Sequence, residues 1–284
     1  MPRLLKEALK NTLKDEELRE VYSALDIIGD IAILKIPDKL LDKKHIIGEA
    51  VLNSIKHVRT VYMQSSAVKD AYRIRELECI AGIDDPITIY KEHGCRFKVN
   101  VKTTYFSPRL STERLRIAEL VRDGEMIVNM FAGIGTFSII IAKKKRCRVY
   151  SIDLNPEAHR YAIENIRLNK VEDRVVPLLG DARVIIRDKL KGIADRVLMP
   201  LPEEAREFID DALLALKDQG IIHYFTHLHA NNKQDAIVRC KEEVDKMMSN
   251  KCRYNIDNVR VVRAVGPRFY QLVADINIDK SFLS

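Results

Sequence analysis

The chain has few cysteines, and no two of them are spaced as metal ligands or redox pairs usually are. There are five in 284 residues, an odd number without any C-x-x-C spacing: Cys79, Cys95, Cys147, Cys240 and Cys252. A disulfide scaffold needs an even number and a structural zinc site needs paired ligands, so both are disfavoured. We expect reduced thiols, most of them packed in the interior.

Long apolar runs are also missing. No stretch reaches the roughly 18 residues needed to span a bilayer. The N-terminal segment MPRLLK lacks the apolar core of a secretory signal. We found no internal repeat and no low-complexity tract. The sequence therefore predicts a cytoplasmic protein that does not enter membranes.

What remains is the composition of an ordinary globular chain. It is 46% hydrophobic and 31% charged, and it is long enough for one large domain or two. The net charge of +7 is spread along the chain and is not gathered in a tail. Such a charge is compatible with an acidic partner such as RNA but does not require one.

A glycine-containing stretch is the most informative part of the sequence. Residues 126–130 form a short apolar run interrupted only by Asn129, as expected for a parallel strand covered on both faces. Gly133 and Gly135 follow, and they let the backbone turn sharply and approach a ligand closely because neither has a Cβ. A strand, a glycine turn and the start of a helix indicate a nucleotide-like cofactor.

This stretch lacks the features of two common phosphate sites. Ser138 stands where the third glycine of a dinucleotide fingerprint would be, and no G-x-x-x-x-G-K-[ST] occurs. Acidic residues do follow two predicted strands, with Asp153 after 148–152 and Asp181 after 175–180. A carboxylate at the first position can accept both ribose hydroxyls. These features favour S-adenosylmethionine, with an NAD-dependent oxidoreductase as the weaker alternative.

Alternating strand and helix signals in the second part of the chain predict an α/β fold with a Rossmann-like, doubly wound and mostly parallel sheet. The expected strands are 126–130, 148–152, 175–180, 194–199, 220–226, 259–264 and 269–278, with helices over 156–169, 203–217 and 235–249. Residues 1–107 have a different order of helix and strand signals, which predicts a small mixed α/β domain. Its expected helices are 10–25 and 40–57, and its expected strands are two short ones within 26–37, then 58–64, 72–80, 87–93 and 95–101.

Residues 103–116 join the two domains and are chemically dense for a linker. Ser111 or Thr112 can cap a helix whose apolar face includes Leu120. A purely structural interpretation fits much of the segment as well. In that interpretation Glu113 supports the helix N-terminus and the arginines are solvated.

Three histidines, His223, His227 and His229, have a spacing that resembles a metal cluster. In a strand that leads into a loop their side chains need not converge. No cysteine or acidic residue stands beside them in the sequence. We therefore predict that they do not form a metal site.

Four segments together carry a family resemblance: IGDIAILKIP at 28–37, YFSPRLSTER at 105–114, NMFAGIG at 129–135 and DLNP at 153–156. They resemble the tRNA guanosine-37 N1-methyltransferases of archaea and eukaryotes and their wyosine-pathway relatives. The second segment is specific to that family, and the resemblance covers nearly the whole chain. It implies an S-adenosylmethionine-dependent class I methyltransferase domain at 108–284. It also implies that the small domain at 1–107 serves tRNA recognition or packing.

The resemblance implies a role for each matching residue. Glu113 would be the general base, Arg109 would stabilise charge on the acceptor, and Tyr105 would lie beside the target base. Pro200 and Pro202 would line the acceptor pocket. The residues that would hold the cofactor are Arg114, Phe131, Gly133, Gly135, Asp153, Leu154, Asp181 and Ala182.

Three features depart from the family pattern. Members that make only N1-methylguanosine tend to have N-x-P after the fourth strand, whereas this chain has Pro200-Leu-Pro202. This version favours the branch that methylates 4-demethylwyosine at carbon 7, alone or together with guanine N1. Asn129 replaces a common aspartate. The chain starts in the small domain, so we expect no additional N-terminal tRNA-elbow domain.

The sequence thus predicts a monomeric, metal-free enzyme that methylates the purine at position 37 in the anticodon loop of tRNA. The methyl acceptor is guanosine N1, 4-demethylwyosine carbon 7, or both. One alternative is transfer of the aminocarboxypropyl group of the same cofactor, and Arg109 counts against it. Another is an RNA-binding protein that retains the cofactor fold without catalysis.

Overall fold

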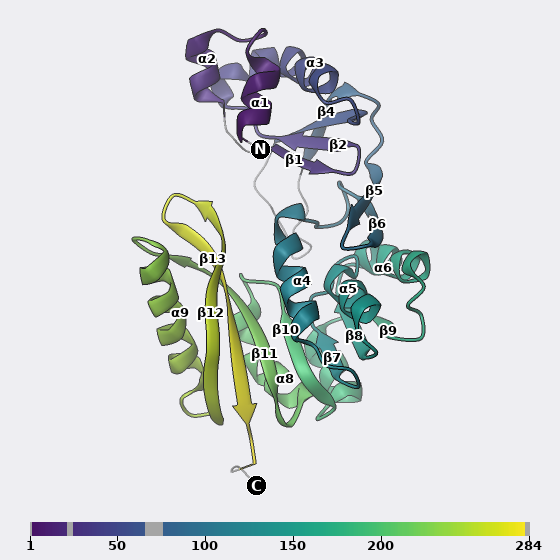
Figure 1. Cartoon of the computed structure of the whole chain (residues 1–284), viewed down its shortest axis with the longest axis vertical. Helices are drawn as coiled ribbons and strands as arrows, with labels where there is room; N and C mark the ends of the chain where they lie inside the picture. The colour runs from purple at the N-terminus through teal and green to yellow at the C-terminus, as the bar shows by residue number, and fades with distance from the viewer. Residues whose placement is uncertain (1, 22–24, 66–75, 282–284) are drawn as a thin grey trace. The chain divides into compact units, whose positions relative to one another are not determined.

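The computed structural model describes residues 2–21, 25–65 and 76–281 (Figure 1). The chain divides into two compact units, Met1–Pro108 and Arg109–Ser284. Each unit has a sheet and a cluster of buried apolar residues of its own. Each unit can therefore be understood from its own packing.

The first unit is built on a four-stranded sheet in the order β1, β2, β3, β4. These strands are β1 (Leu25–Ile28), β2 (Ile31–Leu34), β3 (Thr60–Gln64) and β4 (Leu77–Gly82). β2 and β3 run parallel, because η1 (Asp38–Lys43) and α3 (Lys44–Ser54) cross over between them. The remaining elements are α1 (Pro2–Leu9), α2 (Asp15–Glu20) and the hairpin of β5 (Ile87–Glu92) and β6 (Cys95–Asn100).

Most of the predicted elements of this unit are present, but its N-terminal helix was predicted wrongly. Instead of one helix over 10–25, α1 begins at Pro2, a turn follows, and α2 ends at Glu20. Leu5, Leu9 and Leu13 are all buried, and their spacing of four residues was the helical signal that the prediction missed. The strand predicted over 72–80 lies partly outside the described residues. Within the described residues, β4 begins at Leu77.

The second unit contains a seven-stranded sheet in the order β12, β13, β11, β10, β7, β8, β9. Its parallel strands are β7 (Met126–Asn129), β8 (Arg148–Asp153), β9 (Val175–Leu179), β10 (Ala194–Met199) and β11 (Leu216–His229). The antiparallel strands β13 (Phe269–Asp279) and β12 (Arg253–Gly266) complete the sheet beside β11. The predicted doubly wound, mostly parallel sheet is confirmed.

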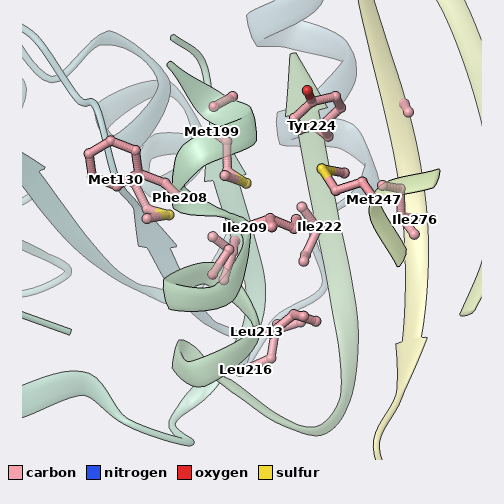
Figure 2. Packing of buried hydrophobic residues seen from close by; sticks show 14 of the residues in the cluster. Met130, Met199, Phe208, Ile209, Leu213, Leu216, Ile222, Tyr224, Met247 and Ile276 are labelled. Atoms are coloured by element: carbon pink, nitrogen blue, oxygen red, sulfur yellow. The ribbon is translucent and has the colours of Figure 1, made fainter. Parts of the chain in front are cut away.

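Helices lie on both faces of this sheet. On one face α4 (Ser111–Leu120) packs on α5 (Thr136–Lys144), and α5 packs on α6 (Pro156–Asn169). The other face is covered by α7 (Ala182–Ile185), η3 (Ile186–Leu190), η4 (Ala205–Phe208), α8 (Ile209–Ala215) and α9 (Lys233–Met248). Figure 2 shows the core between sheet and helices on this second face. Burial of each large apolar side chain there contributes about 1.5–3 kcal/mol.

The local sequence explains α6 well. Asn155 caps the helix, and its side-chain oxygen accepts hydrogen bonds from the backbone N–H groups of Glu157 (2.9 Å) and Ala158 (3.4 Å). Pro156 occupies the first turn, where a missing N–H costs nothing. The helix ends at Asn169, with Lys170 in the left-handed conformation at φ 56°. The predicted helix over 156–169 is confirmed.

Other local predictions were wrong. α4 begins at Ser111 after Leu110, and no side chain caps it, so neither Ser111 nor Thr112 has the predicted role. Leu120 is 45% exposed and does not belong to the buried face. The helix predicted over 203–217 ends at Ala215, because the next residue, Leu216, already belongs to β11 and pairs with Ala194 of β10. The helical segment 182–190 was not predicted.

The cysteines are thiols, as predicted. All five are free, with Cys95, Cys147 and Cys240 buried and Cys79 and Cys252 partly buried. Burial raises the pKa of Cys147 to about 11 and that of Cys240 to about 12, which keeps both protonated and unreactive near neutral pH. Among the described residues, no helix combines the length and apolarity that crossing a bilayer requires.

Candidate active site

The glycine turn lies between β7 and α5. Gly133 and Gly135 have φ values of 56° and 86°, in the left-handed region that favours glycine. A Cβ on Gly135 would lie 3.1 Å from the Cδ1 atom of Ile139, so part of the need for glycine comes from the protein's own packing. Ser138, at the place of a third glycine, forms buried hydrogen bonds with Asn129 (3.1 Å) and Ser151 (2.9 Å). These bonds fasten the first turn of α5 to β7 and β8.

Asp153 connects the end of β8 to this turn. Its Oδ2 atom accepts a hydrogen bond from the backbone N–H of Gly133 (2.5 Å), and its Oδ1 atom accepts one from Asn155 (2.9 Å). Burial raises the pKa of Asp153, although these two backbone groups favour the charged form. Each carboxylate oxygen has further acceptor capacity. The geometry therefore presents a fixed acceptor at the carboxyl end of the strand.

The other predicted cofactor residues lie at the same edge of the sheet. Asp181 follows β9 and caps α7 by accepting a hydrogen bond from the backbone N–H of Arg183 (2.7 Å). Ala182 is buried, whereas Leu154 is 48% exposed. Phe131 packs edge-on against Phe208 with 4.9 Å between the ring centroids. We call Phe131, Gly133, Gly135, Asp153, Asp181 and Ala182 the cofactor cradle.

The cradle suits an adenosine-containing ligand. It offers a carboxylate for ribose hydroxyls and an aromatic and aliphatic border for a flat base. The Oδ1 atom of Asn129, at the end of β7, is buried and receives no hydrogen bond from the described residues. The residues present therefore fit S-adenosylmethionine.

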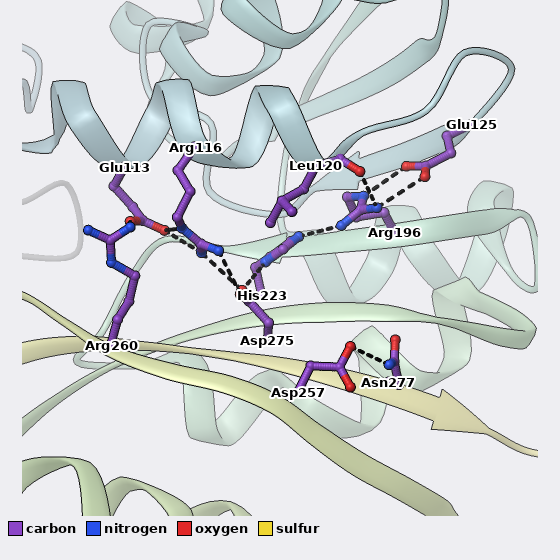
Figure 3. A network of polar contacts seen from close by, with 10 residues as sticks. All are labelled: Glu113, Arg116, Leu120, Glu125, Arg196, His223, Asp257, Arg260, Asp275 and Asn277. Atoms are coloured by element: carbon purple, nitrogen blue, oxygen red, sulfur yellow. Dashed lines mark hydrogen bonds and ion pairs between the residues drawn. The ribbon is translucent and has the colours of Figure 1, made fainter.

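Glu113 belongs to a chain of polar contacts that runs along the inner side of α4 (Figure 3). Arg116 donates from Nη2 and Nε to the Oε1 atom of Glu113, at 2.6 and 2.8 Å. It also donates to both carboxylate oxygens of Asp275, at 2.6 and 3.0 Å. Asp275 in turn contacts His223. Arg196 continues the chain from His223 to Glu125. We call these six residues the base cluster.

The level of the base cluster along the sheet follows from the strand register. His223 is paired with Leu198, and Leu198 with Asn129 at the end of β7. Arg260, the ion-pair partner of Glu113, pairs with Val273, and Val273 pairs with Phe225, two residues beyond His223 on β11. Glu113 therefore lies level with the loops that follow β7 and β10, at the edge of the sheet that carries the cradle.

The histidines have acidic partners that their sequence neighbours did not reveal. The fully buried His223 contacts Asp275 (2.5 Å), and His227 pairs with Glu203 (3.2 Å). His229 is exposed and stacks on Phe269 at 4.4 Å. The three side chains thus have separate partners, and the two acidic partners are distant from the histidines in the sequence. No group of three metal-ligating side chains occurs within the described part of the chain.

The structure places the remaining predicted residues as follows. Arg109 is exposed, whereas Arg114 is 2% exposed and thus contradicts the interpretation that the arginines are solvated. Pro200 is half-buried and Pro202 is buried in the loop after β10. Tyr105 belongs to the first unit, where it borders a small pocket, and its role at the target base stays a prediction.

The sequence interpretation missed Arg116, His223 and Asp275 as parts of the site. Arg116 was detectable, since a cation three residues after Glu113 falls on the same side of a helix. His223 and Asp275 were not detectable together. They are 52 residues apart and meet only because β13 pairs with β11.

A doubly wound sheet with an adenosine-type cradle at its carboxyl edge defines an α/β nucleotide-binding enzyme of the methyltransferase type. The family models agree with this class. The TRM5/TYW2 methyltransferase domain matches residues 88–257, and the TYW2 N-terminal domain matches residues 5–85. The chain belongs to the TRM5/TYW2 methyltransferase family, which confirms the predicted resemblance and fold.

Curated relatives with different activities resemble the chain. Trm5b of Pyrococcus abyssi, a tRNA (guanine(37)-N(1))-methyltransferase, is 40% identical over 93% of this chain and 77% of its own length. Taw21 of Saccharolobus solfataricus, a tRNA 4-demethylwyosine(37)-methyltransferase, is 36% identical over 92% and 96%. A tRNA(Phe) (4-demethylwyosine(37)-C(7)) aminocarboxypropyltransferase of Pyrococcus horikoshii is 32% identical over 98% and 97%.

Solved structures of related proteins agree in fold. A complex of aTrm5 with tRNALeu superposes with a TM-score of 0.84 and 34% identity, covering 98% of this chain and 79% of that one. A crystal structure of TYW2 from M. jannaschii in complex with S-adenosylmethionine superposes with a TM-score of 0.66 and 28% identity, covering 90% and 99%. The aTrm5 structure thus contains bound tRNA, and the TYW2 structure contains bound S-adenosylmethionine.

Proposed function

We propose that this chain is an S-adenosylmethionine-dependent tRNA methyltransferase that modifies the purine at position 37. Its family and the activities of its relatives support this function. The structural observation that carries it is the occurrence, in one unit, of an adenosine cradle and a buried carboxylate at the same edge of the sheet. The cradle would bind the methyl donor, and the carboxylate would accept the proton that the reaction releases.

The cradle residues would bind and orient the cofactor. Asp153 would accept the ribose hydroxyls, while Phe131, Leu154 and Ala182 would border the adenine. Asp181 and Arg114 would complete the site. When bound, S-adenosylmethionine supplies a methyl group already activated by a sulfonium, so the protein mainly has to align donor and acceptor.

Glu113 would accept the proton that methylation releases. At guanine N1 the N–H bond breaks as the N–CH₃ bond forms, and at carbon 7 of 4-demethylwyosine the proton leaves the carbon that gains the methyl. In both reactions the sulfonium becomes a neutral thioether. Burial raises the pKa of Glu113 even though Arg116 and Arg260 lower it, which makes the carboxylate a stronger base. Arg109 would stabilise negative charge on guanine O6.

The acceptor pocket would lie between Glu113 and the loop containing Pro200 and Pro202. Strand order places three strand spacings, about 14 Å, between β8 with Asp153 and β11 with His223. The reactive end of the cofactor and the acceptor base must both lie between Asp153 and the base cluster, within this distance. Neither proline has a side-chain donor, so the loop can accept a large tricyclic base by shape as readily as guanine. Both acceptors are therefore proposed.

The first unit would recognise tRNA, and the target base would leave its stack to enter the pocket. Tyr105 would contact that base. We propose that the enzyme acts as a monomer on the anticodon loop.

The test is to incubate the protein with S-adenosylmethionine and either unmodified tRNA or tRNA carrying 4-demethylwyosine. Nucleosides are then analysed by mass spectrometry. We expect a methylated purine at position 37 from at least one substrate. No such product from either tRNA would overturn the proposal.

A second candidate is transfer of the aminocarboxypropyl group to carbon 7. It is favoured by the match of residues 5–85 to the TYW2 N-terminal domain and by the aminocarboxypropyltransferase relative. The two reactions leave different coproducts, adenosylhomocysteine after methyl transfer and methylthioadenosine after aminocarboxypropyl transfer. Chromatography of the reaction mixture distinguishes them. A non-catalytic RNA-binding protein would bind tRNA, give neither coproduct and be unaffected by Glu113→Ala.

A further inference from the structure

The two carboxylate oxygens of Glu113 have very different surroundings. Oε1 accepts two hydrogen bonds from Arg116. Oε2 is buried and receives no hydrogen bond from the described residues, and the Nη1 atom of Arg260 lies 3.5 Å from it. A buried acceptor without a donor costs free energy, so protonation of this atom would relieve that cost. The carboxylate thus has one oxygen anchored by Arg116 and one buried oxygen without a hydrogen-bond donor.

Arg116 is itself held in place from the far side. It bridges Glu113 and Asp275, and its side chain is 17% exposed. Asp275 binds Arg116 through both oxygens, a bidentate geometry that fixes the plane of the guanidinium. Rotation of Arg116 away from Glu113 would break up to four charge-assisted hydrogen bonds.

Asp275 is in turn held in place by a hydrogen bond with His223. A guanidinium can only donate, so the contact between Arg196 Nη1 and His223 Nε2 (2.7 Å) makes Nε2 the acceptor. The proton of the ring then lies on Nδ1, which donates to Oδ1 of Asp275 (2.5 Å). Burial lowers the pKa of His223, in agreement with a neutral ring. The base cluster therefore has one consistent assignment of donors and acceptors from Arg196 to Glu113.

We propose that Arg116 and Asp275 are positioning residues of the methyl transfer, which anchor Oε1 of Glu113, direct Oε2 to the departing proton and set how strongly Glu113 holds that proton. This inference rests on the proposed function. Arg116 favours the charged carboxylate, and Asp275 opposes it through its own negative charge. The two residues therefore act on Glu113 in opposite directions.

Opposite signs give a test that a purely structural role would not pass. In Arg116→Met the carboxylate loses a cation, so the pKa of Glu113 rises and the acid limb of the rate profile moves to higher pH. In Asp275→Asn it loses a neighbouring anion, so that limb moves to lower pH. We expect a displacement of about one pH unit or more for Arg116→Met. The opposite displacement for Asp275→Asn should be smaller, because Asp275 has the weaker influence on the pKa of Glu113. The charged groups that face Glu113 are Arg116 on α4, Arg260 on β12 and Asp275 on β13.

The rates are single-turnover methyl transfer rates with a tRNA that the wild-type protein methylates. The same titration is followed without tRNA by the ¹³Cδ NMR signal of Glu113, assigned with Glu113→Gln. Arg116→Lys keeps the charge but loses the forked contact, so we expect a near wild-type pH limb with a lower plateau rate. The KM for S-adenosylmethionine should stay within twofold in all variants, because the cradle is separate.

The pair formed by Arg187 and Asp211 at 3.1 Å is the matched control. Arg187→Met and Asp211→Asn should leave the acid limb and the NMR titration unchanged. The inference is overturned if Arg116→Met and Asp275→Asn move the Glu113 titration in the same direction or not at all. If Arg116→Met does not fold, the inference is overturned when Asp275→Asn fails to move the Glu113 titration to lower pH or when Arg116→Lys keeps the wild-type plateau rate. An inactive wild-type protein would instead contradict the proposed function, while the NMR titration would still test the cluster.

Discussion

The cofactor cradle and the base cluster lie in the same unit but are constructed differently. The cradle is held mainly by backbone N–H groups, as in the bond from Gly133 to Asp153, and its main parts come from one stretch of chain, 129–182. The base cluster is held by side chains of four strands or helices, and the bonded pair Arg116 and Asp275 is 159 residues apart. A backbone-built site tolerates most side-chain changes, whereas a side-chain cluster depends on each partner and on pH.

The strongest contrast is expected from Glu113→Gln. Loss of the general base should slow methyl transfer by about 10²–10⁴-fold. Affinity for adenosylhomocysteine, measured by calorimetry, should stay unchanged because the cradle is intact. Glu119→Gln alters an exposed carboxylate on the same helix and should leave the rate unchanged. A rate loss below tenfold for Glu113→Gln would contradict the assigned role.

Asp275→Ala should show how far the cluster depends on a single partner. Removal of this carboxylate leaves Arg116 and His223 without their common partner, and we expect a loss of about 3–5 kcal/mol in the free energy of unfolding at pH 7. Glu164→Ala, which breaks an exposed pair with Arg160, should cost less than about 1 kcal/mol. Urea unfolding followed by circular dichroism measures both.

The loss in Asp275→Ala should depend on pH. Burial alone would raise the pKa of Asp275, but His223 and Arg116 together lower it below its usual range. Stability from this group is therefore fully present above the unfolded-state pKa of about 3.9 and is lost as pH falls below it. The difference in unfolding free energy between Asp275→Ala and wild type should therefore become smaller between pH 5 and pH 3. A difference that stays constant over this range would contradict an ionic origin of the stability that Asp275 contributes.

Asp153→Asn tests the cradle instead. The amide oxygen can still accept from Gly133, but the charge that favours the ribose hydroxyls is gone. We expect affinity for adenosylhomocysteine to fall by about 10–100-fold, with the Glu113 titration unchanged. Asp173→Asn, at an exposed acid beyond α6, is the control. An unchanged affinity would remove Asp153 from the cradle.

Gly135→Ala should have the smallest effect. An alanine at φ 86° costs about 1–2 kcal/mol in the left-handed region. The added Cβ also lies 3.1 Å from Ile139. Gly124→Ala has the same strain at φ 87° with no atom within 4 Å of its Cβ. The difference in unfolding free energy between the two variants measures the crowding at Gly135, and equal losses would show that crowding is negligible.

The same contrast explains which predictions from the sequence succeeded. The glycine turn, the carboxylate at the end of β8 and the bounds of α6 were predicted, because each depends on residues close together in the chain. Boundaries failed where pairing partners decided them. β11 begins at Leu216 because this residue already pairs with Ala194 of β10. The helix α1 was missed although the four-residue spacing of Leu5, Leu9 and Leu13 carried a helical signal.

The sequence by itself determined the doubly wound sheet, the glycine turn and the place of Glu113 in the first turn of a helix. These follow from periodicity, from the conformational freedom of glycine and from family motifs. Only the tertiary structure decided that Arg116 anchors one oxygen of Glu113 and that His223 and Asp275 stabilise Arg116. The physical reason is that strand pairing brings together charges far apart in the chain, and burial then makes each of them depend on its neighbours.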